Sequence, residues 1–397
     1  MSNIIEKEAR KCFEFFWNEV SLSEESYGLI RDNTRNRDMC SIASVGYGLA
    51  AFVIGVERKY ITFEEGKERA LRTLLTMRDK TERIRGFYFH FLEMDTAKRY
   101  RKTELSIIDT AIFLMGALVA GEYFGGEIQT IAEEIYAEVD WNWYRNPDTN
   151  QFYMGYHEVQ RGHFGAWDHY AEQFMMYFLG VAAPKYPVEP TIFYDCPLFC
   201  NVYKDSGLIY HSHGGGLFVY QFSHAFIDFR GKKDKRGIDW YENSVRATKA
   251  NRQYCIDNPL GIKTYGENAW GMTACETPTG YTGAMGALPC VGNKQKFPDG
   301  TVPPCGPIGS IVFTPEESIA AMEFFAQNEK LWGEYGFVDA YNLDVEPEWY
   351  SDMFIGIDKG ISLLMIENYR SELIWKLMNK NKYMQKAFEL LEFYSEC

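Results

Sequence analysis

The segment Gly86-Phe87-Tyr88-Phe89-His90-Phe91 recurs in variant form along the chain, and this repetition decides the expected fold. Each copy is a short aromatic run that contains a glycine or borders one. The other copies are Tyr27-Gly28-Leu29-Ile30-Arg31-Asp32, Gln151-Phe152-Tyr153-Met154-Gly155-Tyr156, Gly207-Leu208-Ile209-Tyr210-His211-Ser212, Lys263-Thr264-Tyr265-Gly266-Glu267-Asn268 and Tyr335-Gly336-Phe337-Val338-Asp339-Ala340. Counted from positions 27, 86, 151, 207, 263 and 335, the intervals are 59, 65, 56, 56 and 72 residues. A period of this size indicates a repeated supersecondary unit.

Stretches with helical periodicity lie between these segments. One group is apolar at most positions, which is typical of helices buried on all sides. Its members are residues 40–56, 106–123, 170–181, 217–229 and 357–369. A second group is amphipathic and comprises residues 5–20, 62–77, 128–144, 238–254 and 314–325. The stretch from 62 begins with Thr62-Phe63-Glu64-Glu65, which is the pattern of an N-terminal capping box.

A buried helix followed by an amphipathic helix, with connections, fills roughly 60 residues, so six such units account for the chain. We therefore expect an all-α fold, an (α/α)6 toroid in which six helical hairpins place an inner ring inside an outer ring. The aromatic segments would be loops or short strands at its mouth. An open helical solenoid is the alternative, but the weak identity between units and the lack of capping repeats favour closure. No linker interrupts the sequence, so residues 1–397 are expected to form one domain.

Composition excludes several classes of function. The net charge of −14 argues against nucleic acid or an anionic membrane as partner. No stretch is expected to span a membrane, which needs roughly 18 apolar residues. The N-terminus lacks the pattern of a signal peptide, and the nine scattered cysteines are typical of reduced thiols, so a cytoplasmic protein is expected. Aromatic residues make up 16%, which fits either core packing or stacking on sugar rings.

The run Trp167-Asp168-His169-Tyr170-Ala171-Glu172-Gln173 gives the strongest candidate for acid–base chemistry. It follows a glycine-punctuated loop and enters a very apolar stretch. Asp168 suits the N-cap of the expected helix. Glu172 would lie one turn further in, where burial raises the pKa of a carboxyl and favours its protonated form. The alternative is a buried glutamate with a structural role.

Other carboxylates stand near expected helix starts. Glu104 precedes the helix that contains Asp109, and Asp358 stands between two glycines, so each could cap a helix or do chemistry. His224 and Asp228 are four residues apart, which is metal-ligand spacing, but no third ligand is evident and no metal site is expected. Side chains expected to bind substrate are Trp167, Tyr170, Asp109, Gln221, His224, Arg230, Asn268, Trp270 and Glu276. A serine-hydrolase elbow, a Walker loop and a dinucleotide fingerprint are absent from the sequence.

Taken together, these motifs resemble the glycoamylase-like family of bacterial proteins. This family includes family 144 of the glycoside hydrolases, which are endo-β-1,2-glucanases, and the related part of cyclic glucan synthases. The matching runs are Gly86-Phe87-Tyr88-Phe89-His90-Phe91-Leu92, Glu104-Leu105-Ser106-Ile107-Ile108-Asp109-Thr110-Ala111, Tyr265-Gly266-Glu267-Asn268-Ala269-Trp270-Gly271, Phe313-Thr314-Pro315-Glu316-Glu317-Ser318, and Gly356-Ile357-Asp358-Lys359-Gly360 with Asn368-Tyr369-Arg370.

The resemblance implies an (α/α)6 toroid that hydrolyses β-1,2-linked glucan or its oligosaccharides with inversion, without a metal or an organic cofactor. It implies that Glu172 is the general acid, that Asp358 is the base, and that Glu104 binds sugar or assists. Two features depart from the family. Secreted members of the family carry an export signal that is not evident here, so the expected substrates are imported oligosaccharides. The stretch 274–281 carries Cys275 and Glu276, whereas the family usually has a version that contains Ser-Asp. That stretch is expected to help define the sugar subsites.

The residues leave other functions open. Among enzymes, the alternatives are an exo-acting hydrolase that releases disaccharides, a glycoside phosphorylase, or a transglycosylase acting on another β-glucan. A non-catalytic carbohydrate-binding toroid and a helical scaffold for protein partners are the alternatives from other classes.

Overall fold

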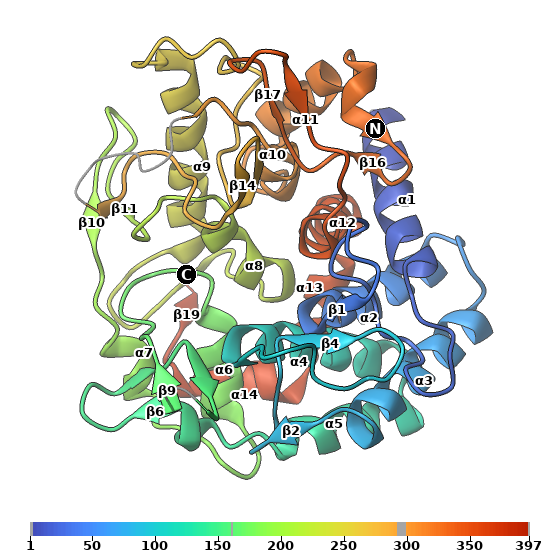
Figure 1. Cartoon of the computed structure of the whole chain (residues 1–397). Helices are drawn as coiled ribbons and strands as arrows, with labels where there is room; N and C mark the ends of the chain where they lie inside the picture. The colour runs from blue at the N-terminus through green and yellow to red at the C-terminus, as the bar shows by residue number, and fades with distance from the viewer. Residues whose placement is uncertain (1–2, 160–161, 292–298, 396–397) are drawn as a thin grey trace.

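The computed structural model describes residues 3–159, 162–291 and 299–395 (Figure 1). Its helices are α1 (Asn3–Asn18), α2 (Ile42–Glu57), α3 (Phe63–Asp79), α4 (Ile107–Phe124), α5 (Gly126–Ala137), η1 (Trp141–Tyr144), α6 (Phe174–Ala182), α7 (Thr191–Tyr194), α8 (Phe218–Phe226), α9 (Trp240–Asp257), α10 (Cys305–Gly309), α11 (Pro315–Phe325), η3 (Glu329–Leu331), α12 (Gly356–Ser371), α13 (Leu373–Met378) and α14 (Lys382–Leu390).

The strands are two or three residues long. They are β1 (Met39–Ser41), β2 (Arg83–Ile84), β3 (Phe87–Tyr88), β4 (Phe91–Glu93), β5 (Leu105–Ser106), β6 (Arg145–Asn146), β7 (Gln151–Phe152), β8 (Gly155–His157), β9 (Gly162–Phe164), β10 (Cys200–Asn201), β11 (Ile209–Tyr210), β12 (Lys232–Lys233), β13 (Cys275–Thr277), β14 (Gly280–Thr282), β15 (Trp332–Gly333), β16 (Gly336–Phe337), β17 (Tyr341–Asn342), β18 (Trp349–Tyr350) and β19 (Tyr394–Ser395). All pair antiparallel, mostly as isolated hairpins.

The helices form a toroid in which one set lies inside another (Figure 1). The inner set is α2, α4, α6, α8, α10 and α12. Neighbouring members contact one another, and α12 returns to α2, which closes the ring. Helices α6 and α8 are joined where the N–H of Met175 donates to Oγ of Ser223 at 3.1 Å. The outer helices α1, α3, α5, α9, α11 and α14 cover the inner set. The apolar and amphipathic stretches of the sequence correspond to these two sets.

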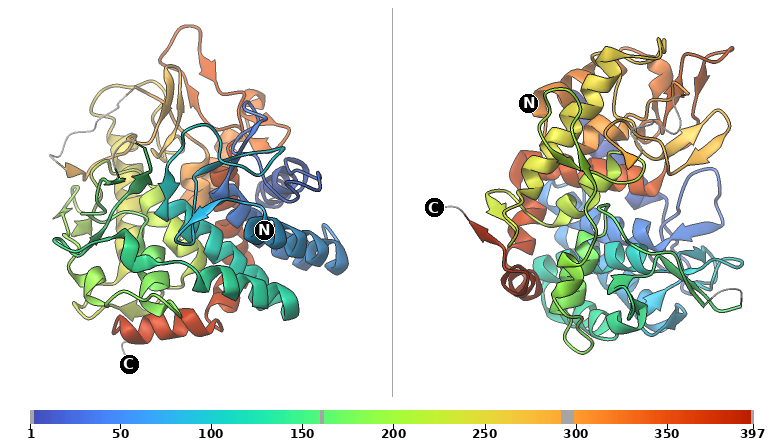
Figure 2. Two further views of the ribbon diagram at one scale, coloured as in Figure 1. Left: turned by 60° about the horizontal axis from the view of Figure 1, so that its bottom comes forward. Right: turned by 90° about the vertical axis from the view of Figure 1, so that its left-hand side faces the viewer.

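Five of the six recurring aromatic segments lie in the connections that lead from an outer helix into the next inner helix, and the sixth, 207–212, lies between the short α7 and the inner helix α8. Four of them contribute a two-residue strand to a hairpin, in β3, β7, β11 and β16. In the right-hand view of Figure 2 the long connections project from one side of the helical layer. The sequence predicted loops or short strands in these segments, and the structure has both there.

Several predicted boundaries were wrong. Helix α6 begins at Phe174 rather than at 170, and α8 ends at Phe226 rather than at 229. The stretch 128–144 divides into α5 and the 3-10 helix η1. The inner helix α10 was not predicted, because its five residues, Cys-Gly-Pro-Ile-Gly, are too few and too poor in helix formers to show periodicity.

Helix α4 also differs from expectation. Its length and composition would allow it to cross a membrane, although no such stretch was expected from the sequence. Within the fold 78% of this helix is buried, so its place in the inner set accounts for its apolar character.

Helices α2 and α4 approach closely because each has a glycine at their contact. A Cβ atom on Gly116 would lie 1.9 Å from the carbonyl oxygen of Gly46, and one on Gly46 would lie 2.5 Å from the carbonyl oxygen of Ile112. Neither partner is the end of a flexible side chain, so the backbones themselves would have to separate. The spacing of the inner set at this point is thus fixed by the absence of two side chains.

We expect Gly116→Ala to destabilise the fold by about 1–3 kcal/mol, as overpacking of a core does. The gain in helix propensity, about 1 kcal/mol, is too small to offset this. Gly266→Ala is the matched control, because a Cβ there meets nothing within 4 Å. Urea unfolding measures both variants. Equal stability of the two would contradict the proposed role of the close contact.

Candidate active site

A cleft of about 840 Å³ opens at the N-terminal side of the inner helices. The first turns of α4 and α12 reach it, and so do Glu172, just before α6, and the aromatic side chains of Phe218 and Phe222 on α8. Asp109 and Asp358 stand in those first turns. Carboxylates at helix N-termini are stabilised by the helix dipole, so this edge of the ring favours a cluster of acids.

Glu172 lies in the loop before α6. The sequence had predicted that it lies one turn inside the helix, which was wrong. Its carbonyl accepts a hydrogen bond from Oγ of Ser223 at 2.6 Å, which ties this loop to α8. Burial, with a smaller effect from the negative charge of Asp109, raises the pKa of Glu172 to about 7. The expected raised pKa is confirmed. A carboxyl with this pKa can hold a proton near neutral pH and release it to a substrate.

Asp358 is buried next to Asp339, a residue that was not predicted from the sequence. Burial raises the pKa of Asp358 to about 6, and hydrogen bonds from Asp339 and Cys305 limit the rise. Burial and the neighbouring Asp358 raise the pKa of Asp339. Among the described residues, neither Oδ1 of Asp339 nor Oδ2 of Asp358 receives an N–H or O–H donor. A proton carried by Asp339 and donated to Asp358 satisfies both groups and leaves Asp358 as the one that ionises near pH 6.

His90 lies between two carboxylates. Its Nδ1 is 2.8 Å from Oε1 of Glu104, and its Nε2 is 3.5 Å from Oδ2 of Asp109. Burial lowers the pKa of His90, but Asp109 and Glu104 more than offset this and raise it to about 9. Burial likewise raises the pKa of Glu104, yet the contact with His90 brings it down to about 2. His90 and Asp109 line the cleft, whereas Glu104 does not and contacts it only through His90. The expectation that Glu104 lies in the cleft is thereby corrected.

Tyr47 lies near the acids without lining the cleft. Its side chain on α2 is fully buried, and its hydroxyl has no hydrogen-bond partner among the described residues. Its ring packs on Phe222 and Phe226 of α8, with centroids 6.2 and 5.8 Å away. Burial raises the pKa of Tyr47, and so do the charges of Asp358, Asp109 and Glu172. All three carboxyls are therefore near one buried hydroxyl.

The stretch 274–281 lies at the cleft, as expected. It forms the hairpin β13–β14, whose Glu276 and Tyr281 line the cavity. Glu276 is held by the guanidinium of Arg35, which also pairs with Asp352, and it accepts from Oγ of Ser351 at 2.7 Å. This network joins three connections of the chain at one side of the cleft.

Seven side chains expected to bind substrate lie outside the cleft. They are Trp167, Tyr170, Gln221, His224, Arg230, Asn268 and Trp270. Five of them are buried, and the core accounts for several. Tyr170 stacks on Trp240 with centroids 5.1 Å apart, and Nε2 of Gln221 donates to the carbonyl of Gly306 and to Oγ of Ser310 at 2.8 Å each. Asn268 stands in the tight turn closed by the bridge between Gly266 and Ala269.

The His224–Asp228 pair does not form on one helix face, because α8 ends at Phe226. His224 instead bonds Oγ of Ser244 through Nε2 at 3.0 Å, and burial lowers its pKa to about 3. Asp228 pairs with Arg230 at 2.9 Å, and Arg230 also reaches Glu372 at 2.8 Å. These contacts are structural.

The sequence contained a signal for three of the residues that were missed. Asp32, His90 and Asp339 are polar positions within the recurring aromatic segments 27–32, 86–91 and 335–340. Asp32 and His90 line the cleft, and Asp339 bonds Asp358. A charged or ionisable side chain inside three of the six aromatic segments was thus the feature that marked the site.

Comparison with known proteins identifies the family of this chain. The Glycoamylase family model matches residues 165–382, which is more than half of the chain. The chain belongs to the Glycoamylase family. The resemblance inferred from the sequence motifs is thereby confirmed.

Members of the Glycoamylase family and their structural neighbours are similar over nearly all of this chain. A curated relative from Parabacteroides distasonis, an exo β-1,2-glucooligosaccharide sophorohydrolase acting at the non-reducing end, is 29% identical. The alignment has 425 positions and covers 96% of this chain and 56% of the relative. The chain thus spans about half the length of that relative. An endo-β-1,2-glucanase from Chitinophaga pinensis, solved with sophorotriose and glucose, is 27% identical, has a TM-score of 0.87, and matches over 100% of this chain and 99% of that one.

Another solved structure, a β-1,2-glucanase from Parabacteroides distasonis, is 27% identical with a TM-score of 0.87, over 98% of this chain and 60% of that one. An endo-β-1,2-glucanase from Talaromyces funiculosus is only 10% identical, with a TM-score of 0.73 over 98% of this chain and 89% of that one. At that identity the likeness concerns the fold, which is a helical toroid.

The raised pKa of Glu172 makes stability depend on pH. The folded chain holds this proton up to about pH 7, whereas an unfolded chain releases it near 4.5. The unfolded state binds fewer protons in this interval, so the contribution of Glu172 to stability falls as the pH rises from about 4.5 to about 7. We expect Glu172→Gln to remove this part of the slope in a plot of melting temperature against pH. Glu189→Gln, at an exposed position, should keep it; identical slopes for both variants would contradict the burial of Glu172.

Proposed function

We propose that this chain is a glycoside hydrolase that cleaves β-1,2-linked glucan or β-1,2-glucooligosaccharides by acid–base catalysis with inversion. The observation that carries the proposal is the pair Glu172 and Asp358, two carboxyls in one cleft with pKa values of about 7 and 6. At a pH between these two pKa values, Glu172 holds a proton while Asp358 is ionised. An inverting glycosidase needs such a pair, with one acid for the leaving oxygen and one base for water.

In this proposal Glu172 protonates the glycosidic oxygen, because it has the higher pKa. Asp358 accepts a proton from water, directly or through a substrate hydroxyl, and Asp339 holds the Asp358 carboxylate in place. Asp109 and His90 face the same cavity and offer polar groups to sugar hydroxyls. Glu104 assists by orienting His90, from which it lies 2.8 Å away.

The substrate class is supported by the relatives. Two solved structures and the curated relative, each 27–29% identical, act on β-1,2-glucans or β-1,2-glucooligosaccharides by their names. The cleft volume of about 840 Å³ suits a few sugar rings, and Phe218, Phe222 and Tyr281 supply aromatic faces on which such rings stack.

We also propose that the toroid is a complete (α/α)6 ring formed by one domain. The pairs α1–α2, α3–α4, α5–α6, α9–α10 and α11–α12 each lead from an outer into an inner helix. The sixth inner helix, α8, follows the short α7, and the outer place beside α6 is occupied by α14 from the end of the chain.

We expect Glu172→Gln to reduce turnover of a β-1,2-glucooligosaccharide by about 10²–10⁴-fold, since it cannot donate a proton to the leaving oxygen. The circular dichroism spectrum should stay unchanged, because glutamine has nearly the same shape. Glu189→Gln, which removes an exposed carboxylate, should keep full activity. Release of reducing sugar measures turnover, and near-normal activity of Glu172→Gln would refute its role.

The stereochemistry can be tested separately. Proton NMR of the first products from β-1,2-glucan should show the α-anomer, because inversion turns a β-linkage into an α-hemiacetal. An initial β-anomer would refute inversion while leaving hydrolysis intact. Incubation with β-1,2-, β-1,3-, β-1,4- and α-1,4-glucans tests the linkage. Measurable binding with no cleavage of any of them would favour a carbohydrate-binding toroid instead.

A further inference from the structure

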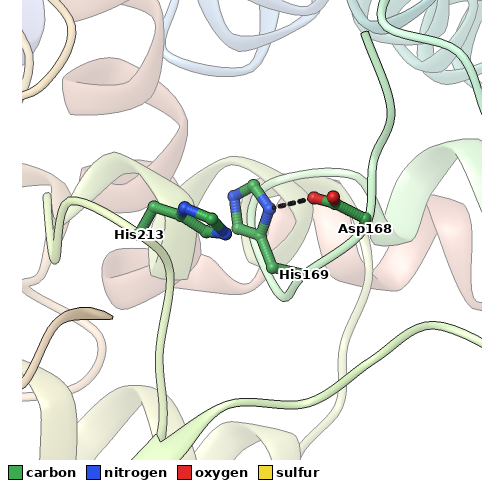
Figure 3. Close-up of side chains that lie close together, drawn as sticks. All are labelled: Asp168, His169 and His213. Atoms are coloured by element: carbon green, nitrogen blue, oxygen red, sulfur yellow. Dashed lines mark hydrogen bonds and ion pairs between the residues drawn. The ribbon is translucent and has the colours of Figure 1, made fainter. Parts of the chain in front are cut away.

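Two histidines and an aspartate converge outside the cleft. Asp168, His169 and His213 each present one ligand atom, and these atoms all lie within 4.8 Å of one another. Figure 3 shows the imidazole of His169 between the carboxylate of Asp168 and the ring of His213. None of the three lines the cleft, and the proposed hydrolysis uses none of them. We propose that they form a binding site for a borderline divalent transition-metal ion of the Zn²⁺ type.

The donor set selects this class of ion. Two imidazole nitrogens and one carboxylate suit Zn²⁺, Co²⁺ or Ni²⁺, whereas Ca²⁺ and Mg²⁺ prefer sites built of oxygen ligands. Ligands at about 2.0–2.1 Å from a tetrahedral Zn²⁺ are separated from one another by roughly 3.3 Å. Oδ1 of Asp168 and Nδ1 of His169 are already 2.9 Å apart, so a small outward movement would admit an ion between them.

His213 gives an independent reason to expect a ligand. Its Nε2 is buried and has no hydrogen-bond partner among the described residues. A buried polar nitrogen without a partner is costly, and coordination to a metal would satisfy it. The rings of His169 and His213 have centroids only 4.0 Å apart, so they are already close enough to act on one ion.

The two loops that carry the ligands are held by their own contacts. Nε2 of Gln173 donates to the carbonyl of His169 at 2.5 Å. Beyond His213, the N–H of Gly215 donates to Oγ of Ser212 at 3.0 Å, and at φ +70° a Cβ on Gly215 would lie 2.1 Å from the carbonyl oxygen of Ala287. The ligands are thus preorganised. The side chain of Asp168 is 57% exposed, which leaves a path by which an ion enters and a position for water.

The position of this site gives it a structural consequence. It joins the loop before α6 to the loop before α8, and Glu172 stands three residues after His169. A bound ion would therefore fasten together the two connections that place the acid. The site stands apart from the carboxylates of the cleft, so its existence does not depend on the proposed hydrolysis.

The test is a titration of the full chain, freed of metal with EDTA and desalted, with Zn²⁺ followed by calorimetry. We expect one ion per chain, and a visible absorption band when Co²⁺ replaces Zn²⁺. The melting temperature should rise with Zn²⁺, because the ion binds the folded state. His213→Ala and His169→Ala should each weaken Zn²⁺ binding at least tenfold, since even an outer partner of a metal ligand is worth about 10–100-fold.

Two controls keep the result specific. His157→Ala removes an imidazole outside the cluster and should leave binding unchanged. Cys200→Ser removes the exposed thiol among the described cysteines, which could itself bind Zn²⁺, and should also leave it unchanged. If His213→Ala fails to fold, Asp168→Asn, at an exposed position, serves as the second ligand variant. No Zn²⁺ binding by the unaltered chain, or an isotherm that the ligand variants do not change, would overturn the proposal.

Discussion

The burial of carboxyl groups around one cleft is the constraint on which the rest of this structure depends. A charged carboxylate loses solvation when it leaves water, so it must be protonated, paired, or placed near a positive potential. Each solution is present here. Glu172 and Asp339 keep protons, Glu104 and Asp109 share the charge of His90, and Asp109 and Asp358 lie at helix N-termini. The inner ring supplies these environments because several of its helices point their N-terminal ends at one place.

The scaffold also binds the positive charge next to Asp358 to other groups. Lys359 is its direct neighbour in sequence, yet its ammonium group binds Oε1 of Glu8 at 3.0 Å and the carbonyl of Phe337 at 2.6 Å. Glu8 belongs to the outer helix α1 and also accepts from the N–H of Phe337 at 2.9 Å. Lys359 still lowers the pKa of Asp358, but burial has the larger effect and the pKa stays raised. The buried ion pair thus joins α1, β16 and α12 and at the same time preserves the acid–base character of the cleft.

The sequence predicted the long helices well and the site only in part, for physical reasons. Periodicity over 15 residues is a strong signal, so α2, α4, α9 and α12 were found, whereas the five residues of α10 carried none. Carboxylates at helix starts or after glycine loops reached the cleft, as Asp109 and Asp358 do. Tyr170 and Gln221 do not reach the cleft, because the ring of the first stacks and the amide of the second forms hydrogen bonds inside the core. These partners are distant in sequence and therefore leave no local pattern.

The two carboxyls of the cleft are not interchangeable, because their neighbours differ. Burial raises the pKa of Glu172 and the charge of Asp109 adds to this effect, so its proton is retained to about pH 7. Asp358 accepts from Asp339 and Cys305, and these bonds favour its ionised form although the side chain is buried. Two similar groups therefore separate into a proton donor and a proton acceptor through their neighbours alone. Asp339 keeps its charge unchanged in the reaction, yet its hydrogen bond lowers the pKa of Asp358 and so helps to separate the proton acceptor from the proton donor.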